Sequence, residues 1–196
     1  METKHIALIQ GHPDPAGNRF CHALAAAYIK GAQAAGHTIQ VIDIAHIQFP
    51  ILRTYADFYE GVVPESLQQA QQTIQSAQHL VVIYPLWLGS MPAYLKAFIE
   101  QVFRPGFAMD KGTDGLSWKK LLAGKTAHIV VTMGMPAVIF RWYYLAHSLK
   151  SLERNILQFC GIKPTQETLI GRVDSMDDSK RKQWLAKMEM MGRSGK

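Results

Sequence analysis

Cysteine is scarce in this sequence, and long apolar runs are absent from it. Two cysteines, Cys21 and Cys160, occur in 196 residues, and no apolar leader follows a basic start. A secreted chain cross-linked by disulfides would carry more cysteines, so the composition favours a reducing compartment. The longest apolar stretch is interrupted by Arg141 and falls short of the ~20 residues that a membrane-spanning helix needs. We therefore expect a soluble cytoplasmic protein whose two thiols are small core residues.

Acidic side chains are fewer than basic ones. The chain has 21 lysines and arginines against 15 aspartates and glutamates, which gives a net charge of +6 and a pI near 9.3. Its densest basic groups, residues 119–125 and 180–187, form no nucleic-acid-binding motif, so we expect no nucleic-acid partner. The basic residues are either solvated helix faces or a surface that attracts phosphate-bearing cofactors or other anions.

Several motifs that carry chemistry are also missing. The sequence has no GxGxxG for a dinucleotide and no GxSxG for a hydrolase. The triplet from Gly124 to Thr126 resembles the end of a Walker motif, but Lys119 stands where the first glycine belongs. Eight histidines include no HxxxH or HExxH pair, so we expect no bound metal.

Apolar runs alternate with amphipathic stretches along the chain. Strands are expected at 4–10, 38–44, 79–84, 126–133 and 165–173, and helices at about 19–35, 64–78, 92–103, 144–160 and 179–191. This alternation predicts an α/β fold, a doubly wound five-stranded parallel sheet with helices on both faces. We find no linker and no repeat, and expect a single domain over residues 1–196.

Ligands of such sheets lie beyond the carboxyl ends of the strands, where the strand order switches. Three loops qualify: residues 11–20, 85–91 and 132–136. In the first, Asn18 precedes a helix whose free N–H groups attract anions, and His12 and Arg19 add donors. The alternative is that these polar side chains satisfy only the backbone of their own loop.

The second loop places a large aromatic ring where no strand or helix can continue. Pro85 fixes the backbone as the strand ends, so Leu86, Trp87 and Leu88 are expected to project into the crevice. Such a surface suits a planar heterocycle, although Trp87 could instead fold back on the core.

The third loop supplies a hydroxyl from Thr132 and, at Gly134, a point where the backbone can approach a ligand closely. Beyond it, residues 140–147 concentrate four aromatics, an arginine and a histidine. They form either the start of a helix with core aromatics or part of the ligand site.

Residues 84–108 have the most specific pattern, YPLWLGSMPAYLKAFIEQVFRPGFA. This segment resembles the signature of the flavodoxin-like NAD(P)H:quinone oxidoreductases, which include quinone reductases and ancillary flavoproteins of potassium-efflux systems. Residues 11–20 and 132–134 are similar to the first and third loops of that family, and residues 155–164 to a further stretch. The likeness covers most of the chain and implies a flavodoxin-like version of the predicted fold.

The resemblance also implies roles for individual residues. It assigns the phosphate and ribityl chain of a flavin to His12, Asn18 and Phe20, with Arg19 beside them. It assigns the isoalloxazine ring to Pro85, Leu86, Trp87 and Leu88, and the polar edge of that ring to Thr132 and Gly134. Family members place a tyrosine and a histidine beyond the third loop, and the candidates here are Tyr143, Tyr144 and His147.

Family members are homodimers in which the second subunit completes the catalytic pocket, so a homodimer is implied here. The cofactor implied is FMN, with FAD possible, and the lack of the long C-terminal extension of the larger animal enzymes leaves FMN as plausible as FAD. The expected activity is two-electron hydride transfer from NADPH or NADH to a quinone, by a ping-pong mechanism. Two alternatives are a flavin-binding regulatory subunit of a membrane transporter and a one-electron carrier, which is usually acidic.

Overall fold

The structure is a computed structural model that describes residues 2–112 and 117–196. Within these residues the chain forms a five-stranded parallel sheet in the order β2-β1-β3-β6-β7. Its strands are β1 (His5–Gln10), β2 (Thr38–Asp43), β3 (His79–Pro85), β6 (Thr126–Thr132) and β7 (Thr165–Ile170). This order confirms the predicted doubly wound sheet and is the flavodoxin-like one, with its switch point between β1 and β3.

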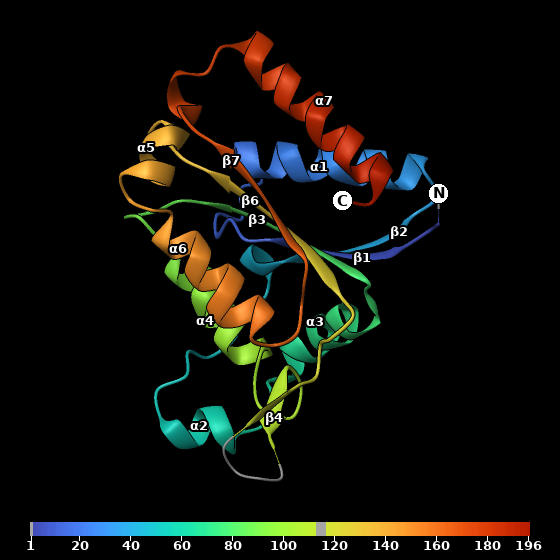
Figure 1. The fold of residues 1–196 in the computed structure, drawn as a ribbon, viewed down its shortest axis with the longest axis vertical. Coiled ribbons are helices and arrows are strands. Elements are labelled where there is room, and N and C mark those ends of the chain that lie inside the picture. Colours follow the sequence, from blue (N-terminus) through green and yellow to red (C-terminus); the bar gives the residue numbers. More distant parts are fainter. Residues whose placement is uncertain (1, 113–116) are drawn as a thin grey trace.

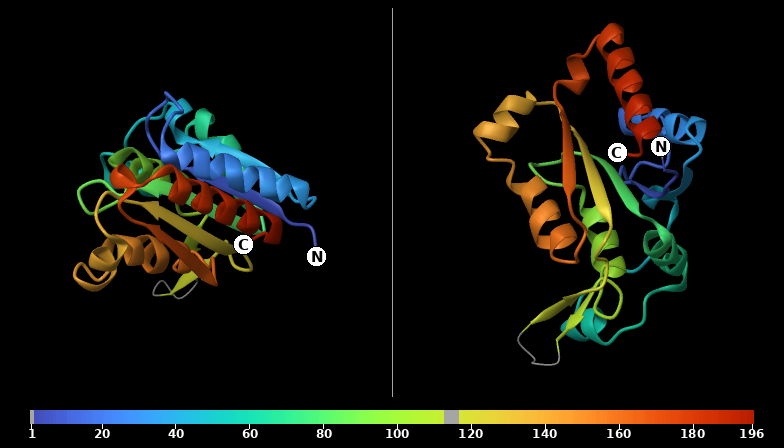
Figure 2. Two further views of the ribbon diagram at one scale, coloured as in Figure 1. Left: turned by 90° about the horizontal axis from the view of Figure 1, so that it is seen from above. Right: turned by 45° about the vertical axis from the view of Figure 1, so that its right-hand side comes forward.

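Helices cover both faces of the sheet, as predicted. The helices α1 and α7 lie on one face, and α3, α4 and α6 lie on the other (Figure 1); the view from above in Figure 2 separates the two layers. The helices are α1 (Phe20–Ala34), α2 (Tyr55–Tyr59), α3 (Glu65–Ser76), α4 (Ala93–Val102), α5 (Ala137–Trp142), α6 (His147–Lys150) and α7 (Asp178–Ser194). Helix α6 continues in π-helical form as η2 (Ser151–Gln158), and two short 3₁₀ turns are η1 (Ile44–His46) and η3 (Val173–Ser175).

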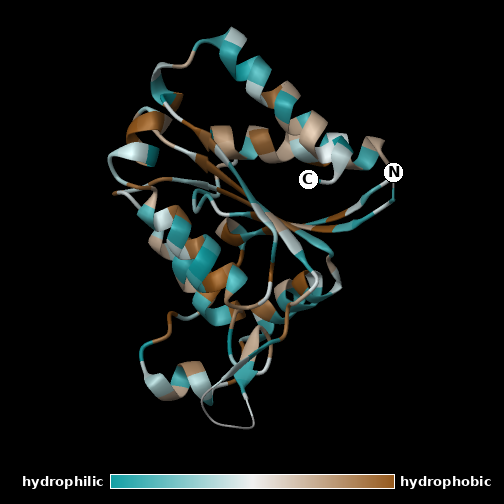
Figure 3. Ribbon diagram, viewed as in Figure 1, coloured by the Kyte–Doolittle hydropathy of each residue, from teal (hydrophilic) through white to brown (hydrophobic). Residues whose placement is uncertain are grey.

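The central strands are apolar because both of their faces are covered. All seven residues of β3 are buried, and its neighbour β6 is buried from its second residue onward. Such strands lack the polar alternation of a half-exposed sheet. Figure 3 shows the hydrophobic residues concentrated along these central strands, and the edge strand β2 is more exposed.

Glycine allows the two helices of one layer to touch through their backbones. A Cβ atom added at Gly31 of α1 would lie 1.9 Å from the carbonyl oxygen of Glu189 in α7. A Cβ atom at Gly192 of α7 would lie 2.1 Å from the carbonyl oxygen of Tyr28 in α1. Neither position has room for any side chain, so these glycines set the spacing of the α1–α7 layer.

The segment 45–63, between the predicted strand 38–44 and the predicted helix 64–78, contains the short helix α2. Thr54 Oγ1 accepts from the backbone N–H of Asp57 at 3.0 Å, and Asp57 Oδ2 accepts from the N–H of Thr54 at 3.0 Å, which makes a capping box. The buried Arg104 guanidinium donates to the carbonyl oxygens of Asp57 and Gly61. Local capping and one buried cation therefore order a segment that has little apolar periodicity.

The structure departs from the sequence prediction at two further places. Segment 104–124, for which neither a strand nor a helix was predicted, carries the antiparallel hairpin of β4 (Met109–Lys111) and β5 (Trp118–Lys120), and its residues 113–116 lie outside the described part. The long helix expected over 144–160 starts only at His147, after α5, because Leu145 and Ala146 have φ angles of 53° and 49°. A right-handed helix cannot include such residues.

Lys125 gives the Walker-like triplet a structural role. Its Nζ donates to the carbonyl oxygens of Gln75 at 2.7 Å and Ala77 at 2.6 Å, which satisfies groups left free at the end of α3.

Cys21 and Cys160 are buried free thiols, which confirms their prediction as core residues. Over the described residues no helix has both the length and the hydropathy needed to cross a bilayer. The same residues contain no cluster of three metal-ligating side chains.

Candidate functional site

The loops after β1, β3 and β6 enclose one cavity of about 520 Å³, which we call the carboxyl-end cavity. Its volume is in the range of small-molecule and cofactor sites. The lining residues are His12, Asn18, Arg19, Phe20, Cys21, Pro85, Leu86, Trp87, Thr132, Met133, Gly134, Val173, Asp174 and Arg181. The structure thus brings together every residue that the sequence assigned to a cofactor except Leu88.

His12 is a buried hydrogen-bond donor at the end of β1. Its backbone N–H donates to Gln10 Oε1 at 3.2 Å, and its ring Nδ1 accepts from the N–H of Asp14 at 3.1 Å. Because Nδ1 accepts, the ring proton of the neutral form belongs on Nε2. Burial, and after it the neighbouring His22, lower the pKa of His12 below its ordinary value. At neutral pH this ring is therefore an uncharged donor with a fixed tautomer.

Arg19 is engaged within its own loop. Its Nε and Nη2 atoms lie 2.7 Å and 2.6 Å from Asp14 Oδ2, and Asp14 Oδ1 accepts from the N–H of Ala16 at 2.9 Å. The hydrogen bond from Ala16, followed by that from Arg19, lowers the pKa of Asp14. The positive charge of Arg19 is thus already paired, although its side chain lines the cavity.

Helix α1 presents a free amino terminus to the same cavity. In the part of the chain that the structure describes, its N-cap Arg19 makes no capping side-chain bond, and the first turn holds no acidic residue. The unpaired N–H groups and the helix dipole favour an anion there. Cys21 Sγ lies 3.2 Å from Thr132 Oγ1, so this end of α1 is tied to the end of β6. Burial raises the pKa of the Cys21 thiol to about 11, which keeps it protonated.

Trp87 stands at the mouth of the cavity on a tight turn. Its N–H donates to the carbonyl oxygen of Ser90 at 2.8 Å, and the N–H of Ser90 donates back at 3.0 Å. Trp87 is 49% exposed, and its ring meets the His12 ring edge-on, with 5.7 Å between centroids. Leu88, with a φ of 46°, points its side chain fully into solvent and lies outside the cavity lining. Its predicted contact with the cofactor stays a prediction.

The fourth wall of the cavity comes from the turn after β7, which carries none of the predicted site residues. Val173, Asp174 and Arg181 reach the cavity from η3 and the start of α7. A Cβ atom added at Gly134 would lie 2.6 Å from Asp174 Oδ2, so the two loops touch at this glycine. The available signal was topological, since β7 is parallel to β6 and its carboxyl end opens on the same edge.

The three residues predicted to be catalytic lie on the connection between α5 and α6 and at the start of α6. Tyr143 is 76% exposed and Tyr144 is 49% exposed, and their rings contact each other edge to face at 5.0 Å. His147, the first residue of α6, is also exposed. None of the three lines the carboxyl-end cavity, and their catalytic role stays a prediction.

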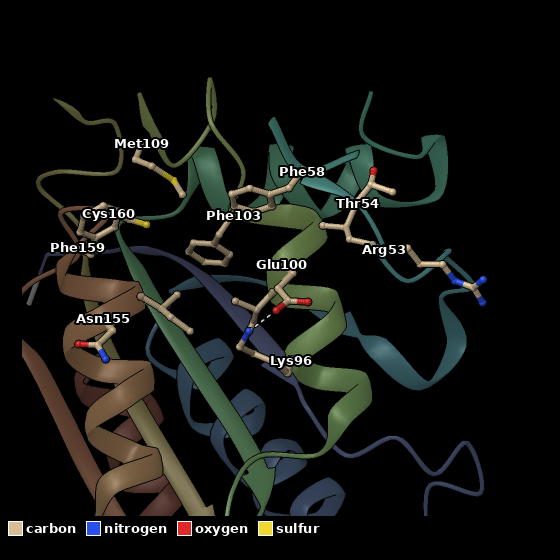
Figure 4. Close-up of a pocket in the computed structure, with 13 residues that line it drawn as sticks. Arg53, Thr54, Phe58, Lys96, Glu100, Phe103, Met109, Asn155, Phe159 and Cys160 are labelled. Atoms are coloured by element: carbon tan, nitrogen blue, oxygen red, sulfur yellow. Dashed lines mark hydrogen bonds and ion pairs between the residues drawn. The ribbon is translucent and has the colours of Figure 1, made fainter. Parts of the chain in front are cut away.

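A second cavity of about 490 Å³, which we call the α4 cavity, shares no lining residue with the first. It lies between α4, η2 and the segment before α2, and its walls are mainly apolar (Figure 4). In Figure 4, Phe58 and Phe103 point toward each other, and the Lys96–Glu100 ion pair lies at one side. This cavity has an aromatic lining, and its two cationic side chains are Arg53 and Lys96, the second of which is paired with Glu100.

Comparisons with known proteins agree with this geometry. The chain is 27% identical over 179 residues to an uncharacterised NAD(P)H oxidoreductase of Haemophilus influenzae, covering 89% of this chain and 87% of that protein. It is 29% identical over 138 residues to an FMN-dependent NADH:quinone oxidoreductase of Ruegeria pomeroyi, covering 61% of this chain and 65% of that relative.

A solved NAD(P)H:quinone oxidoreductase from Methanothermobacter marburgensis shares the fold, with a TM-score of 0.82 at 22% identity over 98% of this chain and 97% of that one. The family model for the flavodoxin-like fold matches residues 4–190. That match spans nearly the whole sequence, and this chain belongs to the flavodoxin-like fold family.

Proposed function

We propose that this chain is a flavin-dependent NAD(P)H:quinone oxidoreductase that transfers two electrons as a hydride by a ping-pong mechanism. The observation that carries the proposal is the meeting of three loops in one cavity, with the half-exposed Trp87 beside a neutral His12. The names of the Haemophilus and Ruegeria relatives support an NAD(P)H-linked reaction, and the second supports FMN and a quinone.

The residues present fit a flavin in three respects. The uncapped start of α1 and the Nε2–H of His12 suit a phosphate. Pro85, Leu86 and Trp87 offer an apolar wall for a flat ring. Gly134 has no side chain between its backbone and the polar edge of the ring, and Asp174 occupies the place where a Cβ atom would lie. FMN is the proposed cofactor, with FAD possible and NADPH or NADH as donor, and when bound the flavin supplies the hydride chemistry.

The protein contributes a preorganised frame around that cofactor. The N–H of Leu86 donates to the carbonyl oxygen of Thr132 at 2.7 Å, and the N–H of Met133 donates to that of Ile170 at 2.8 Å. These bonds fix the second and third loops to one another and to β7. Backbone N–H groups near Gly134 would then hold the polar edge of a bound flavin ring without reorganising.

One open cavity serves both substrates in this proposal. Trp87 would cover one face of a bound flavin ring and leave the other face to the substrates, so the nicotinamide would depart before the quinone binds. Steady-state rates with FMN-loaded protein, NADPH and a water-soluble benzoquinone test this order. Parallel double-reciprocal lines are the expected result, and converging lines would mean that both substrates bind together.

We keep Tyr143, Tyr144 and His147 as proposed catalytic residues and a homodimer as the proposed assembly. The exposed connection that carries them also exposes Trp142 and Leu145, at 72% and 49%. An apolar surface of this kind commonly marks a protein interface. A second copy that brings its aromatic α4 cavity over this connection would bury it and complete the substrate pocket. Gel filtration with light scattering should give twice the chain mass.

The proposal also includes a single domain over residues 1–196 and a cytoplasmic location. Buried free thiols at Cys21 and Cys160 support a reducing compartment. The alternative role as a regulatory subunit of a membrane transporter stays a prediction. Co-purification of a transporter with the tagged chain would support that alternative.

A further inference from the structure

Leu88 stands at the tip of the turn that follows β3. The N–H groups of Trp87 and Ser90 each donate to the carbonyl oxygen of the other residue, so Leu88 and Gly89 form a two-residue connection. Their φ angles are 46° and 78°. Positive φ angles at both central positions are the mark of a type I′ turn, in which asparagine followed by glycine is the favoured pair. Leucine therefore occupies a position where the backbone favours asparagine or glycine.

This leucine is unfavourable on two grounds. A left-handed backbone disfavours a residue with a bulky side chain, and the side chain is fully exposed to water. It belongs to neither apolar core cluster of the described residues. Within the same residues, a Cβ atom added at Gly89 would meet nothing within 4 Å apart from its chain neighbours, so the tip projects into open space. The packing of the fold thus gives no reason for leucine at this position.

The turn lies at the mouth of the carboxyl-end cavity, because its first residue, Trp87, forms part of the cavity wall. Residues 84–95, which include the turn, contain no charged side chain. The other walls do carry charge, from Arg19 in the first loop and from Asp174 in the turn after β7. An apolar group that extends out of the cavity therefore displaces the least water from charged groups on the side of this turn.

We propose that Leu88 selects quinones that carry a long apolar side chain, by covering the part of that chain that leaves the cavity. This inference rests on the proposed function and names the class of quinone that the same site takes. The quinone ring would enter the cavity, and its side chain would lie against the exposed face of Leu88. The contact removes apolar surface of both partners from water, and the hydrogen-bonded turn needs little further ordering.

The test compares one quinone ring with and without a side chain. A dimethoxy-methyl-benzoquinone and its decyl derivative are supplied to FMN-loaded protein with NADPH or NADH, for the wild type, Leu88→Asn, Leu88→Met and Val62→Asn. Asparagine suits a type I′ turn, so Leu88→Asn removes the apolar surface and keeps the backbone. Val62 is another highly exposed apolar residue that lines neither cavity, so Val62→Asn is the matched control.

The wild type should show a higher kcat/KM for the decyl derivative than for the ring alone. In Leu88→Asn this preference should fall about 10-fold, through KM, as expected for the lost burial of roughly two methylene groups. Leu88→Met should keep most of the preference, because methionine presents a similar apolar surface, and Val62→Asn should match the wild type. Quenching of tryptophan fluorescence by each quinone, in oxidised protein without nucleotide, should show the same change in affinity.

Two structural measurements separate this role from packing. Leu88→Asn should unfold in urea at a midpoint no lower than that of the wild type, because asparagine is favoured in the turn. A clear drop in the midpoint would mean that Leu88 packs within its own fold, and would overturn the inference. A mass from gel filtration with light scattering that is halved in Leu88→Asn would mean that a second copy covers the turn, which would overturn it as well.

Other outcomes distinguish the inference from the proposed function. Equal kcat/KM values for the two quinones in the wild type, or an unchanged preference in Leu88→Asn, would overturn the inference alone. Equal losses for both quinones, together with weaker FMN binding, would place Leu88 in the wall for the flavin ring and would also overturn it. A wild type that takes up no flavin, or that reduces neither quinone, would overturn the proposed function and this inference with it.

Discussion

His79 makes the stability of this fold sensitive to acid. It begins β3 with only 4% of its surface exposed, its Nδ1 lies 2.7 Å from Thr126 Oγ1, and its Nε2 has no partner among the described residues. Burial, followed by the nearby Lys4, His128 and His37, lowers the pKa of His79 from 6.5 to about 4.

The sign of the effect follows from where the proton binds. Between pH 6.5 and 4 the unfolded chain takes up a proton at this histidine and the folded chain does not, so stability falls as the pH falls. At ~1.4 kcal/mol for each pH unit between the two pKa values, the loss comes to roughly 3 kcal/mol. The contribution is fully present above pH 6.5 and is lost by about pH 4.

Urea unfolding followed by tryptophan fluorescence at pH 7 and pH 4 measures this loss. His79→Gln keeps a polar side chain and removes the titrating group. Its loss of stability between pH 7 and pH 4 should therefore be about 3 kcal/mol smaller than that of the wild type. Thr126→Val serves as the control, because it removes the hydrogen bond at a cost of about 1 kcal/mol but leaves the histidine to titrate. Equal pH losses in His79→Gln and the wild type would refute the reasoning.

Three further substitutions test the site and the packing. Trp87→Ala should weaken flavin binding about 10-fold, because the wall for the ring is lost, and unchanged retention and turnover would contradict the assignment. Gly134→Val should lower flavin affinity, because the added Cβ would lie 2.6 Å from Asp174 Oδ2. Adding Asp174→Ala should restore part of that affinity. No recovery in the double variant would argue against this contact. Gly31→Ala should destabilise the fold by roughly 3 kcal/mol in thermal or urea unfolding, because its Cβ would lie 1.9 Å from the Glu189 carbonyl oxygen. An unfolding midpoint equal to that of the wild type would show that the two helices can separate freely.

The catalytic assignment can be tested apart from cofactor binding. His147→Gln and Tyr143→Phe should keep the flavin content of the wild type and lower kcat for quinone reduction about 10-fold. Tyr55→Phe is a matched control, because Tyr55 is an exposed aromatic on α2 and lines neither cavity. Wild-type kcat in both variants would remove these residues from the mechanism.

The sheet and the three loops were predictable because their signals are local. A strand buried on both faces is apolar throughout, as β3 is, and a parallel sheet places the ends of β1, β3 and β6 on one edge. These rules predict that His12, Trp87 and Thr132 lie close together, and the structure places all three in one cavity.

What the sequence missed depends on contacts between distant segments. Arg181 reaches the cavity only because α7 packs on α1, and nothing near residue 181 indicates that Phe20 lies beneath it. The break before α6 was not predicted because Leu145 and Ala146 adopt positive φ angles, which favour glycine. The residue types at these two positions therefore do not indicate a helix break. The pairing of Arg19 with Asp14 likewise appears only once the loop has folded.

The visible spectrum of the purified protein tests the central claim most directly, with the released cofactor identified by chromatography and NADPH or NADH added without oxygen. The account predicts flavin absorption bands, native or after FMN is added, that bleach on addition of the nucleotide and return when a quinone is supplied. A colourless protein that also fails to take up FMN or FAD would contradict it.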